Sequence, residues 1–204
     1  MKNQKHTEHF DSCKMDNEVI KYLSKYISLS EELIDIIEEN IVTKSFKKGT
    51  ILLKEGHFSN ECYFILKGCI RSYFIKDGEE ITTDFYTEEQ SVTPACYGQQ
   101  IPSTHYLECI EDTVVCLGTV ELENEAFEKY PQLESVCRIL GEKMMAEFQT
   151  SFINYKISSP EERYLQLLKN RPELVQRVPQ YQLASYLGIT PESLSRIRKR
   201  LVKK

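Results

Sequence analysis

Five polar residues near the C-terminal end of the chain could contact nucleic acid. They carry one carboxylate, one hydroxyl and three cationic groups, and their spacing places them on one face of a helix: Glu192, Ser195, Arg196, Lys199 and Arg200. Such groups hydrogen-bond to base edges and to phosphates, and a helix fits the major groove of DNA. This run therefore predicts a DNA-recognition helix.

The residues around this polar face predict how the helix begins and packs. Leu194, Ile197 and Leu201 recur at three- and four-residue spacing, so the opposite face is apolar. Thr190 is a good N-cap and Pro191 a good first helical residue. The helix is therefore predicted to start at about residue 191 and to bury one side.

A preceding helix, over about residues 179–187, completes a predicted helix-turn-helix. Its Leu183 and Leu187 lie one turn apart, and Ala184 is small where a second helix must cross closely. Gly188 supplies the turn, because only glycine takes a positive φ without strain. The alternative is an ordinary surface helical hairpin whose basic face is only solvated.

The charge distribution supports DNA binding although the chain as a whole is acidic. The net charge of the 204 residues is −5. From residue 158 to the end there are ten basic and four acidic residues, a net charge of +6, which leaves −11 on the remainder. This asymmetry is typical of a DNA-binding part attached to an acidic body.

Composition predicts a cytoplasmic protein without a bound metal. No apolar run approaches the roughly 18 residues of a membrane span, and the polar N-terminus lacks a signal-peptide core, so no membrane partner is expected. None of the seven cysteines forms a C-x-x-C pair, which favours reduced thiols over a zinc or iron–sulfur site. His6, His9 and Cys13 lie in a predicted flexible tail that preorganises nothing.

The middle of the chain predicts an antiparallel β-roll. Short runs of β-branched and aromatic residues are separated by turn signals such as Gly49, Gly68 and Asp77-Gly78. The runs cover residues 41–43, 50–53, 62–66, 69–75, 80–86, 106–110 and 114–117. Two amphipathic helices are predicted before them, and a long loop is predicted over residues 88–103.

A long helix is predicted to follow the roll, over residues 131–157. Apolar residues recur along it close to a heptad spacing: Leu133, Cys137, Leu140, Met144, Phe148 and Phe152. One small β-domain cannot cover so long a stripe, so these residues are predicted to form a dimer interface. The alternative is that the stripe packs wholly against its own β-domain.

A hinge at residues 157–160 is predicted to separate this helix from the C-terminal part. Ser159 and Glu162 form a predicted capping box, and the helix that follows is expected to bury Tyr164, Leu165 and Leu168. The predicted organisation is α+β: a flexible tail over residues 1–16, a β-roll over 17–130, a dimerisation helix over 131–157 and a helix-turn-helix domain over 158–204.

The order of these parts resembles the Crp/Fnr family of bacterial transcription regulators. The resemblance covers about residues 31–201. It is carried by the helix-turn-helix and by two further motifs, Phe46-Lys47-Lys48-Gly49-Thr50-Ile51-Leu52 and Tyr63-Phe64-Ile65-Leu66-Lys67-Gly68. It implies a cyclic-nucleotide-binding-like jelly roll, a homodimer on a palindromic DNA site with half-sites about 34 Å apart, and RNA polymerase as a partner.

The resemblance also implies roles for residues of the recognition helix. Family members contact base edges with a glutamate and with an arginine four residues later, which here are Glu192 and Arg196. Ser195 resembles the Fnr branch and is the third predicted base contact. The predicted phosphate contacts are Gln180, Thr190, Ser193, Lys199 and Arg200.

The segment that matches the family's cyclic-nucleotide pocket departs from the family pattern. Thr104 stands for the family's hydroxyl residue, but Ser103 replaces the arginine that holds the cyclic phosphate. Burying a phosphate without a cationic partner is costly, so cyclic AMP is not expected, no cofactor is predicted, and the effector is unknown. A pocket for another small molecule would use Glu88, Glu89, Ser103, Thr104 and Tyr106.

Two other classes of function stay open at the level of sequence. A cupin-like enzyme would need a metal triad in the roll, where only His57 and His105 fall; no enzymatic activity is predicted. A ligand-sensing or protein-interaction module whose helix-turn-helix no longer binds DNA specifically is motivated by the acidic body. It is also motivated by the end of the sequence at Lys204, where the family's β-hairpin wing would follow.

Overall fold

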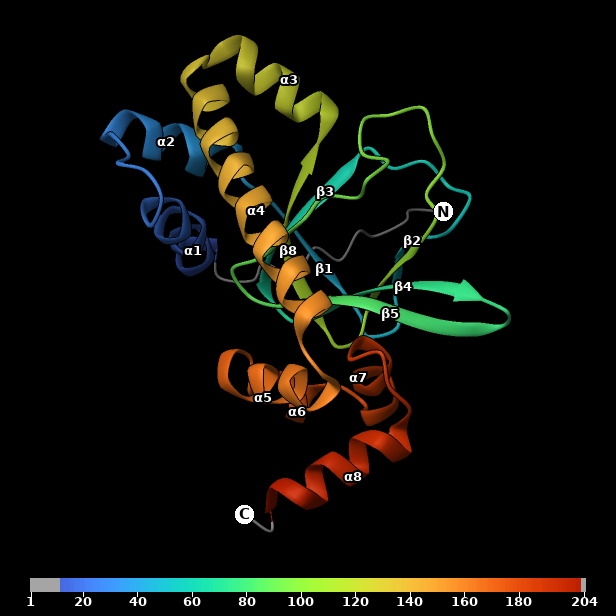
Figure 1. The fold of residues 1–204 in the computed structure, drawn as a ribbon. Coiled ribbons are helices and arrows are strands. Elements are labelled where there is room, and N and C mark those ends of the chain that lie inside the picture. The colour runs from blue at the N-terminus through green and yellow to red at the C-terminus, as the bar shows by residue number, and fades with distance from the viewer. Residues whose placement is uncertain (1–11, 203–204) are drawn as a thin grey trace.

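The computed structural model describes residues 12–202 and has α1, α2 and α4 along one side of a two-sheet β-roll and the C-terminal helices below it (Figure 1). The first eleven residues of the predicted tail, with His6 and His9, lie outside the described residues. α1 (Ser12–Ser24) begins within that predicted tail, and α2 (Glu31–Asn40) starts where Ser30 Oγ accepts the Leu33 N–H at 3.2 Å. This is the N-cap that the sequence predicts.

Eight antiparallel strands form the roll. They are β1 (Val42–Phe46), β2 (Ile51–Leu53), β3 (Glu61–Lys67), β4 (Ile70–Lys76), β5 (Glu79–Tyr86), β6 (Ser91–Val92), β7 (Tyr106–Cys109) and β8 (Thr113–Thr119). They are ordered β1-β8-β3-β6 in one sheet and β2-β7-β4-β5 in the other. The predicted antiparallel roll is therefore confirmed, with one more strand than the sequence indicates, since β6 lies inside the segment predicted as a loop.

The two sheets enclose an apolar core that arises from the alternation of side chains along each strand. Tyr63, Ile65, Ile70, Leu107 and Val115 are all at most 2% exposed. Every second residue of a strand faces this core, which is why short alternating runs could be recognised as strands in the sequence. The roll is thus a closed hydrophobic body rather than an open barrel.

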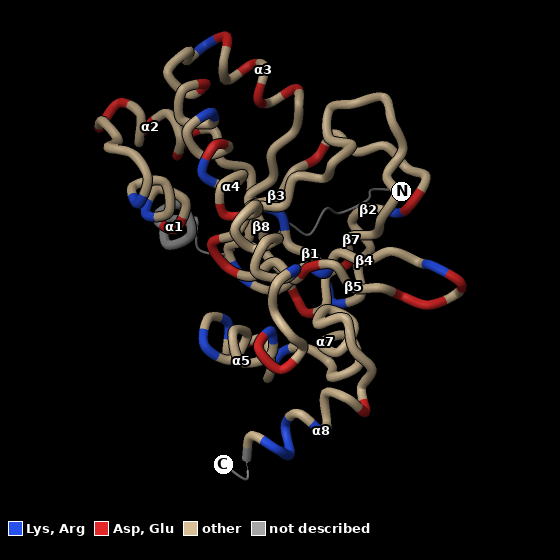
Figure 2. The backbone as a smooth tube through the Cα atoms, in the orientation of Figure 1, with Lys and Arg blue, Asp and Glu red and all other residues tan. Residues whose placement is uncertain are grey.

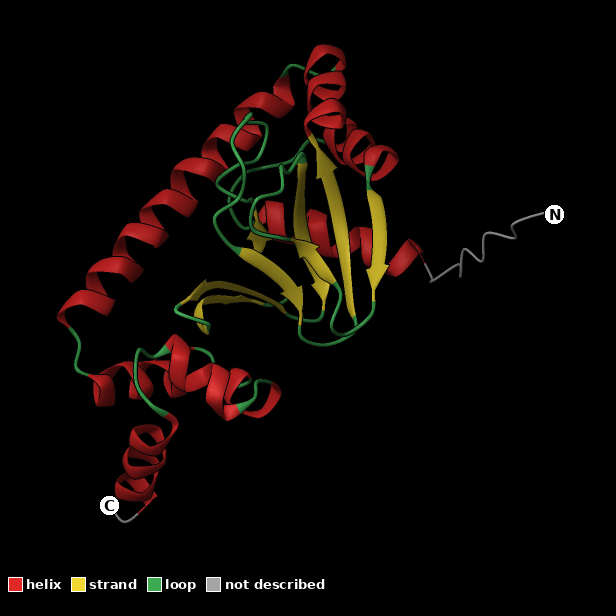
Figure 3. Cartoon of the chain, turned by 90° about the vertical axis from the view of Figure 1, so that its right-hand side faces the viewer, coloured by secondary structure: helices red, strands yellow, loops and turns green. Residues whose placement is uncertain are grey.

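The long helix α4 (Gln132–Ile157) follows α3 (Val120–Lys129) and runs along the side of the roll (Figure 3). Its apolar stripe divides into two parts. Near the N-terminal end, Val136 is buried against Leu23 of α1 and Leu33 of α2. Toward the C-terminal end, Phe148 is 67% exposed and Phe152 53% exposed. The first part of the stripe is therefore covered by α1 and α2, whereas the second part is exposed among residues 12–202.

The C-terminal part contains α5 (Pro160–Asn170), α6 (Leu174–Arg177), α7 (Gln180–Tyr186) and α8 (Pro191–Val202). The capping box of Ser159 and Glu162 is present. The prediction for the buried face of α5 was partly wrong, because Leu165 is 43% exposed and Leu168 36% exposed. Leu167 is buried in their place, since α5 turns its Tyr164–Leu167 edge toward the core it shares with α7 and α8.

Gly188, in the turn between α7 and α8, contacts the end of α4. Its φ is +69°, and an added Cβ would lie 2.6 Å from the Tyr155 hydroxyl. The Tyr155 ring is in turn covered by the Arg163 guanidinium, 4.5 Å from the ring centre. The turn of the helix-turn-helix is therefore packed against the hinge.

We expect Gly188→Ala to destabilise the fold more than Gly49→Ala, which also has a positive φ but no atom within 4 Å of an added Cβ. The left-handed backbone alone costs about 1–2 kcal/mol in each variant, and displacement of Tyr155 adds to this only at Gly188. Urea unfolding of both variants measures the difference. Equal losses of unfolding free energy in the two variants would contradict the packing of Gly188 against Tyr155. So would a Gly188→Ala variant that recovers no stability when Tyr155→Phe is added.

Candidate nucleic-acid interface

The turn between α7 and α8 is a Schellman motif built around Gly188. The Gly188 N–H donates to Ser185 O at 2.9 Å, and the Ile189 N–H donates to Ala184 O at 3.0 Å. These bonds satisfy the last carbonyls of α7, and only a residue with positive φ allows them. Sequence reasoning placed the turn correctly because glycine at this point is a local signal.

The recognition helix α8 is fixed by a cap at its start and by an apolar face along its length. Thr190 Oγ1 accepts the Ser193 N–H at 3.3 Å, as an N-cap should. Leu194 is fully buried and Ile197 nearly so. They pack with Leu183, from α7, in the core of the helix-turn-helix. The opposite face of α8 is consequently turned to solvent.

That exposed face carries the three predicted base contacts. Glu192, Ser195 and Arg196 are all exposed, and α8 lies at the end of the molecule farthest from the roll, with basic residues along it (Figure 2). The pKa of Glu192 is lowered, mainly by its own backbone N–H and by the Thr190 hydroxyl, and also by the positive charge of Arg196. At neutral pH the face therefore presents one hydrogen-bond acceptor beside a guanidinium donor.

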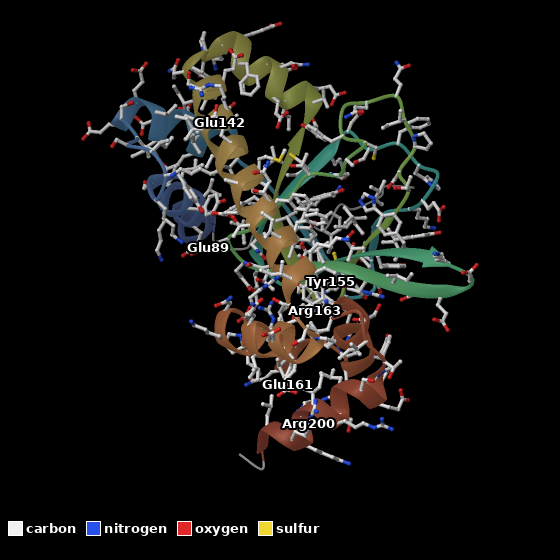
Figure 4. The ribbon with its side chains drawn as sticks, viewed as in Figure 1. Glu89, Glu142, Tyr155, Glu161, Arg163 and Arg200 are labelled. Carbon is white, nitrogen blue, oxygen red and sulfur yellow. The ribbon has the colours of Figure 1, made fainter. Side chains whose placement is uncertain are left out.

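The predicted phosphate contacts differ in whether their side chains already form a hydrogen bond or an ion pair within the protein. Gln180 and Lys199 are exposed. Thr190 and Ser193 are hydrogen-bonded to each other at 3.2 Å between their hydroxyls, so both also serve the cap. Arg200 forms an ion pair with Glu161 of α5 at 2.8 Å (Figure 4). A phosphate bound at Arg200 would therefore compete with this glutamate.

A cluster that the sequence did not reveal joins the helix-turn-helix part to the roll. The Arg177 guanidinium, at the end of α6, donates to both Glu88 oxygens at 2.7 and 2.9 Å and to Gly68 O at 2.9 Å. It also pairs closely with Glu111, and Glu88 accepts the Gly68 N–H at 2.9 Å. We call these four residues the Arg177 cluster.

The electrostatics of the Arg177 cluster favour its ionised form. Burial alone would raise the pKa of Glu88, but its hydrogen bonds from Arg177 and from the Gly68 N–H outweigh that effect and lower the pKa. Glu88 therefore stays a carboxylate well below neutral pH. Its contribution to stability is complete above its ordinary pKa of 4.5 and is lost as the pH falls through the lowered value.

Further contacts extend this junction along the edge strand β5. Arg171 donates to Phe85 O at 2.7 Å. The Ser185 hydroxyl of α7 accepts the Thr82 N–H at 2.9 Å, and the rings of Phe85 and Tyr186 meet edge-on with centres 5.4 Å apart. An unpaired edge strand exposes backbone groups, and α7 covers this one. The position of the helix-turn-helix relative to the roll is thus set by polar and apolar contacts together.

The residues of the predicted ligand pocket do not converge on one place. Glu88 belongs to the Arg177 cluster, and Glu89 pairs with Lys25, which directly follows α1. Ser103 is buried and its hydroxyl donates to His105 O at 2.8 Å, while Tyr106 stacks on Tyr73 with ring centres 5.0 Å apart. Thr104, an exposed residue, adjoins that second group. The structure therefore separates the two glutamates from the other three residues.

The predicted dimer residues divide as the stripe of α4 does. Leu133 and Leu140 are half-buried and pack on the cluster formed with α1 and α2. Cys137 is exposed. Met144, Phe148 and Phe152 are exposed, and the last two rings stack 6.4 Å apart. The C-terminal half of α4 thus carries the uncovered apolar surface.

Two general features bear on other functions. Among residues 12–202, no three His, Cys, Asp or Glu side chains are grouped as a metal site would need. Over the same range, none of the helices combines the length and the apolarity that crossing a membrane requires. His57 follows β2 and His105 precedes β7. Neither belongs to a metal-site group among the described residues.

Together these features define a class of protein: a sensor-type β-roll joined by a long helix to a helix-turn-helix with an exposed polar recognition face. Residues 43–130 match the family model of the cyclic nucleotide-binding domain. The chain is 25% identical to the anaerobic regulatory protein of Haemophilus influenzae, covering 96% of this chain and 79% of that protein. It is 26% identical to the fumarate and nitrate reduction regulatory protein of Vibrio cholerae, covering 96% and 81%.

Solved structures agree in fold. FixK2 from Bradyrhizobium japonicum superposes with a TM-score of 0.62 over 80% of this chain and 85% of that chain, at 19% sequence identity. The catabolite activator protein of Thermus thermophilus gives a TM-score of 0.54 over 89% and 87%, at 16% identity. In sequence the chain is thus similar to regulatory proteins over most of its length, and in fold it resembles regulators of the Crp/Fnr type.

The Arg177 cluster predicts a coupling between Arg177 and Glu88 that a double-mutant cycle can measure. We expect Arg177→Gln and Glu88→Gln to show a coupling of about 1–2 kcal/mol at pH 7, discounted for the partial exposure of both side chains. The coupling should be lost as the pH falls through the lowered pKa of Glu88, below 4.5, because the carboxylate becomes protonated there. Urea unfolding at several pH values provides the measurement.

The exposed pair of Arg138 and Glu142 on α4, 2.7 Å apart, is the matched control. Its cycle should give only about 0.3–0.5 kcal/mol. A coupling at Arg177 no larger than this control, or one independent of pH, would contradict the assignment of the cluster as the main polar link between the two parts.

Proposed function

We propose that the chain is a homodimeric transcription regulator that recognises a palindromic DNA site through α8. The observation that carries this proposal is the division of α8 into a buried apolar face and an exposed face with Glu192, Ser195 and Arg196. The buried face holds the helix on the rest of the domain. The exposed face is then free to enter a major groove without any rearrangement of the core.

In this proposal the residues of the helix-turn-helix have two kinds of role. Arg196 donates to guanine O6 and N7, and Glu192 accepts from a cytosine amino group, while Ser195 adds a third base contact. Gln180, Thr190, Ser193 and Lys199 contact phosphates, and so does Arg200 once it leaves Glu161. Base contacts determine which sequence is bound, and phosphate contacts determine how strongly any sequence is bound.

The proposed dimer interface is the uncovered C-terminal half of α4. Large exposed apolar patches are rare on monomeric proteins and indicate an interface. Five large apolar side chains are exposed on this half of the helix: Met145, Phe148, Phe152, Ile153 and Ile157. Pairing of two α4 helices about a two-fold axis would bury them and would present two α8 helices to two half-sites.

We further propose that cyclic AMP does not control this regulator. Ser103, at the position of the family's phosphate-binding arginine, is occupied by hydrogen bonds within its own turn. Arg71 is buried in the roll, but its guanidinium donates to Glu80 at 2.6 Å and to Thr82 at 2.9 Å. No uncommitted cation is therefore seen in the described part of the roll's interior to hold a cyclic phosphate.

By family likeness, the proposed regulator works in the cytoplasm, where its DNA is, and contacts RNA polymerase. The relatives are regulatory proteins, and we propose no enzymatic activity for this chain.

Arg196→Ala and Lys199→Ala should have different effects on binding to a specific site and on binding to unrelated DNA. A site is first selected from random DNA with the wild-type protein, and binding is then measured by fluorescence anisotropy over a range of salt. We expect Arg196→Ala to lose about 1–3 kcal/mol on the selected site but little on unrelated DNA. Lys199→Ala should weaken both and reduce the salt slope by about 1. Failure of the wild type to enrich any site would favour the alternative of a module that no longer binds DNA specifically.

Phe152→Glu should convert the dimer to monomers. A buried phenylalanine contributes about 2 kcal/mol to association. A two-fold interface loses two of them, about 4 kcal/mol in all, so the dissociation constant should rise about 1,000-fold. Phe58→Glu is the control, because Phe58 is 64% exposed but lies in the loop after β2. Sedimentation velocity measures both, and a monomeric wild type would overturn the proposed interface.

A further inference from the structure

A cavity of about 690 Å³ lies where α1, the β5–β6 turn, α4 and the helix-turn-helix part meet. Glu89, labelled in Figure 4 beside α1, is on its rim. A volume of this size is in the range of small-molecule sites. The cavity is separate from the exposed face of α8 and from Ser103, Thr104 and Tyr106.

The walls of the cavity are rich in aromatic rings. They come from four different elements: Tyr22, Tyr26, Tyr86, Phe148 and Tyr186. Tyr22, in α1, and Tyr26, in the turn after it, meet edge-on with centres 5.1 Å apart, so the two rings are held at an angle to each other. An angled pair of ring faces is the usual beginning of a cage for a cationic group, because each face carries partial negative charge.

The charged groups of the cavity are predominantly acidic. Five carboxylates line it against two cationic side chains, Lys25 and Arg171. The carboxylates are Asp84, Glu88, Glu89, Glu147 and Glu173. Glu88 is neutralised by Arg177 from outside, whereas no hydrogen bond or ion pair of Glu147 is found among the described residues. The field inside the cavity therefore repels anions and attracts cations.

Two lysine ammonium groups of the chain already form cation–π contacts with these rings. Lys25 Nζ lies 6.0 Å from the centre of the Tyr22 ring and pairs with Glu89. Lys143 Nζ lies 4.7 Å from the centre of the Tyr26 ring, on α4. The Tyr22 and Tyr26 rings thus each attract a positive charge, which is an observation independent of the count of carboxylates.

Glu147 lines the same cavity as these rings. The pKa of Tyr22 is raised, mainly by burial and by its hydrogen bond with Tyr26, and also by the negative charges of Glu147 and Glu89. A cation that entered between α1 and α4 would therefore meet an aromatic face and a carboxylate together.

We propose that this cavity binds a small organic cation of the quaternary ammonium class, held by the faces of Tyr22 and Tyr26 and by Glu147. Lys25 then acts as an internal competitor, because it occupies one ring face and neutralises Glu89. The binding needs no DNA, so its test stands apart from the proposed regulatory function.

Choline is the probe, and its uncharged carbon analogue 3,3-dimethylbutan-1-ol is the matched ligand. Both have the same shape, so only the charge differs. Isothermal titration calorimetry on the full chain should show saturable binding of choline and at least 10-fold weaker binding of the analogue. Equal affinities for the two ligands would overturn the proposal, since they would indicate a merely apolar cavity.

Variants with opposite expected signs test the residues. Glu147→Gln should weaken choline binding about 5-fold, in line with the loss of one partly solvated charge contact. Lys25→Met keeps most of the side-chain volume and should strengthen binding by a similar factor. Glu134→Gln is the control. It changes an exposed residue near the start of α4, the helix that also carries Glu147, and should have no effect on choline binding.

The gain at Lys25 is the decisive outcome, because general damage to the fold cannot strengthen binding. Weaker binding by Lys25→Met, in a protein whose circular dichroism spectrum and unfolding midpoint match the wild type, would overturn the competitor role. No saturable choline binding by either the wild type or Lys25→Met would overturn the site itself.

Discussion

The position of the recognition helix depends on one arginine. Arg177 lies at the end of a helix of only four residues, α6, which could not hold its own place. Its guanidinium is shared between two carboxylates and a backbone carbonyl of the roll. Removing a charge from water is expensive, and only a site with several well-placed acceptors compensates. Because all these acceptors belong to the roll, the charge is satisfied in a single relative placement of the two parts.

The apolar contacts around the cluster follow the same arrangement. Cys69, Phe85 and Ile110 of the roll share one core with Leu174 and Leu183 of the C-terminal part. Burial raises the pKa of the Cys69 thiol to about 12, so this cysteine serves as a small apolar residue. The two α8 helices of a dimer would therefore have their spacing set by the roll as well as by α4. A change in the roll near Glu88 could then be transmitted to DNA binding without any contact at α8.

The sequence was informative wherever the signal is local. The Gly188 turn, the Thr190 cap and the period of Leu194 and Ile197 lie within a few residues of one another, and each has a direct physical cause. Contacts between distant segments leave no such pattern: Arg177 and Glu88 are 89 residues apart. The missed strand β6 has only two residues and is defined by its pairing with β3, which no window of sequence contains. The buried face of α5 was predicted wrongly for the same reason. Leu165 and Leu167 are both leucines, and only the contacts of Leu167 with distant segments show that it is the buried one.

The predicted ligand pocket also depends on contacts that no short window of sequence contains. The sequence offered Ser103, Thr104 and Tyr106 because they occupy the family's phosphate-binding segment, yet in this chain that segment is closed by its own hydrogen bonds. A phosphate site needs a free cation, and Arg71 is paired with glutamates. The cavity beside α1 has the opposite electrostatics, with exposed carboxylates and aromatic faces. It also touches Arg171, at the end of α5, and Tyr186 of α7, which both contact Phe85 of β5. Charge in this cavity therefore acts on the same junction that the Arg177 cluster fixes.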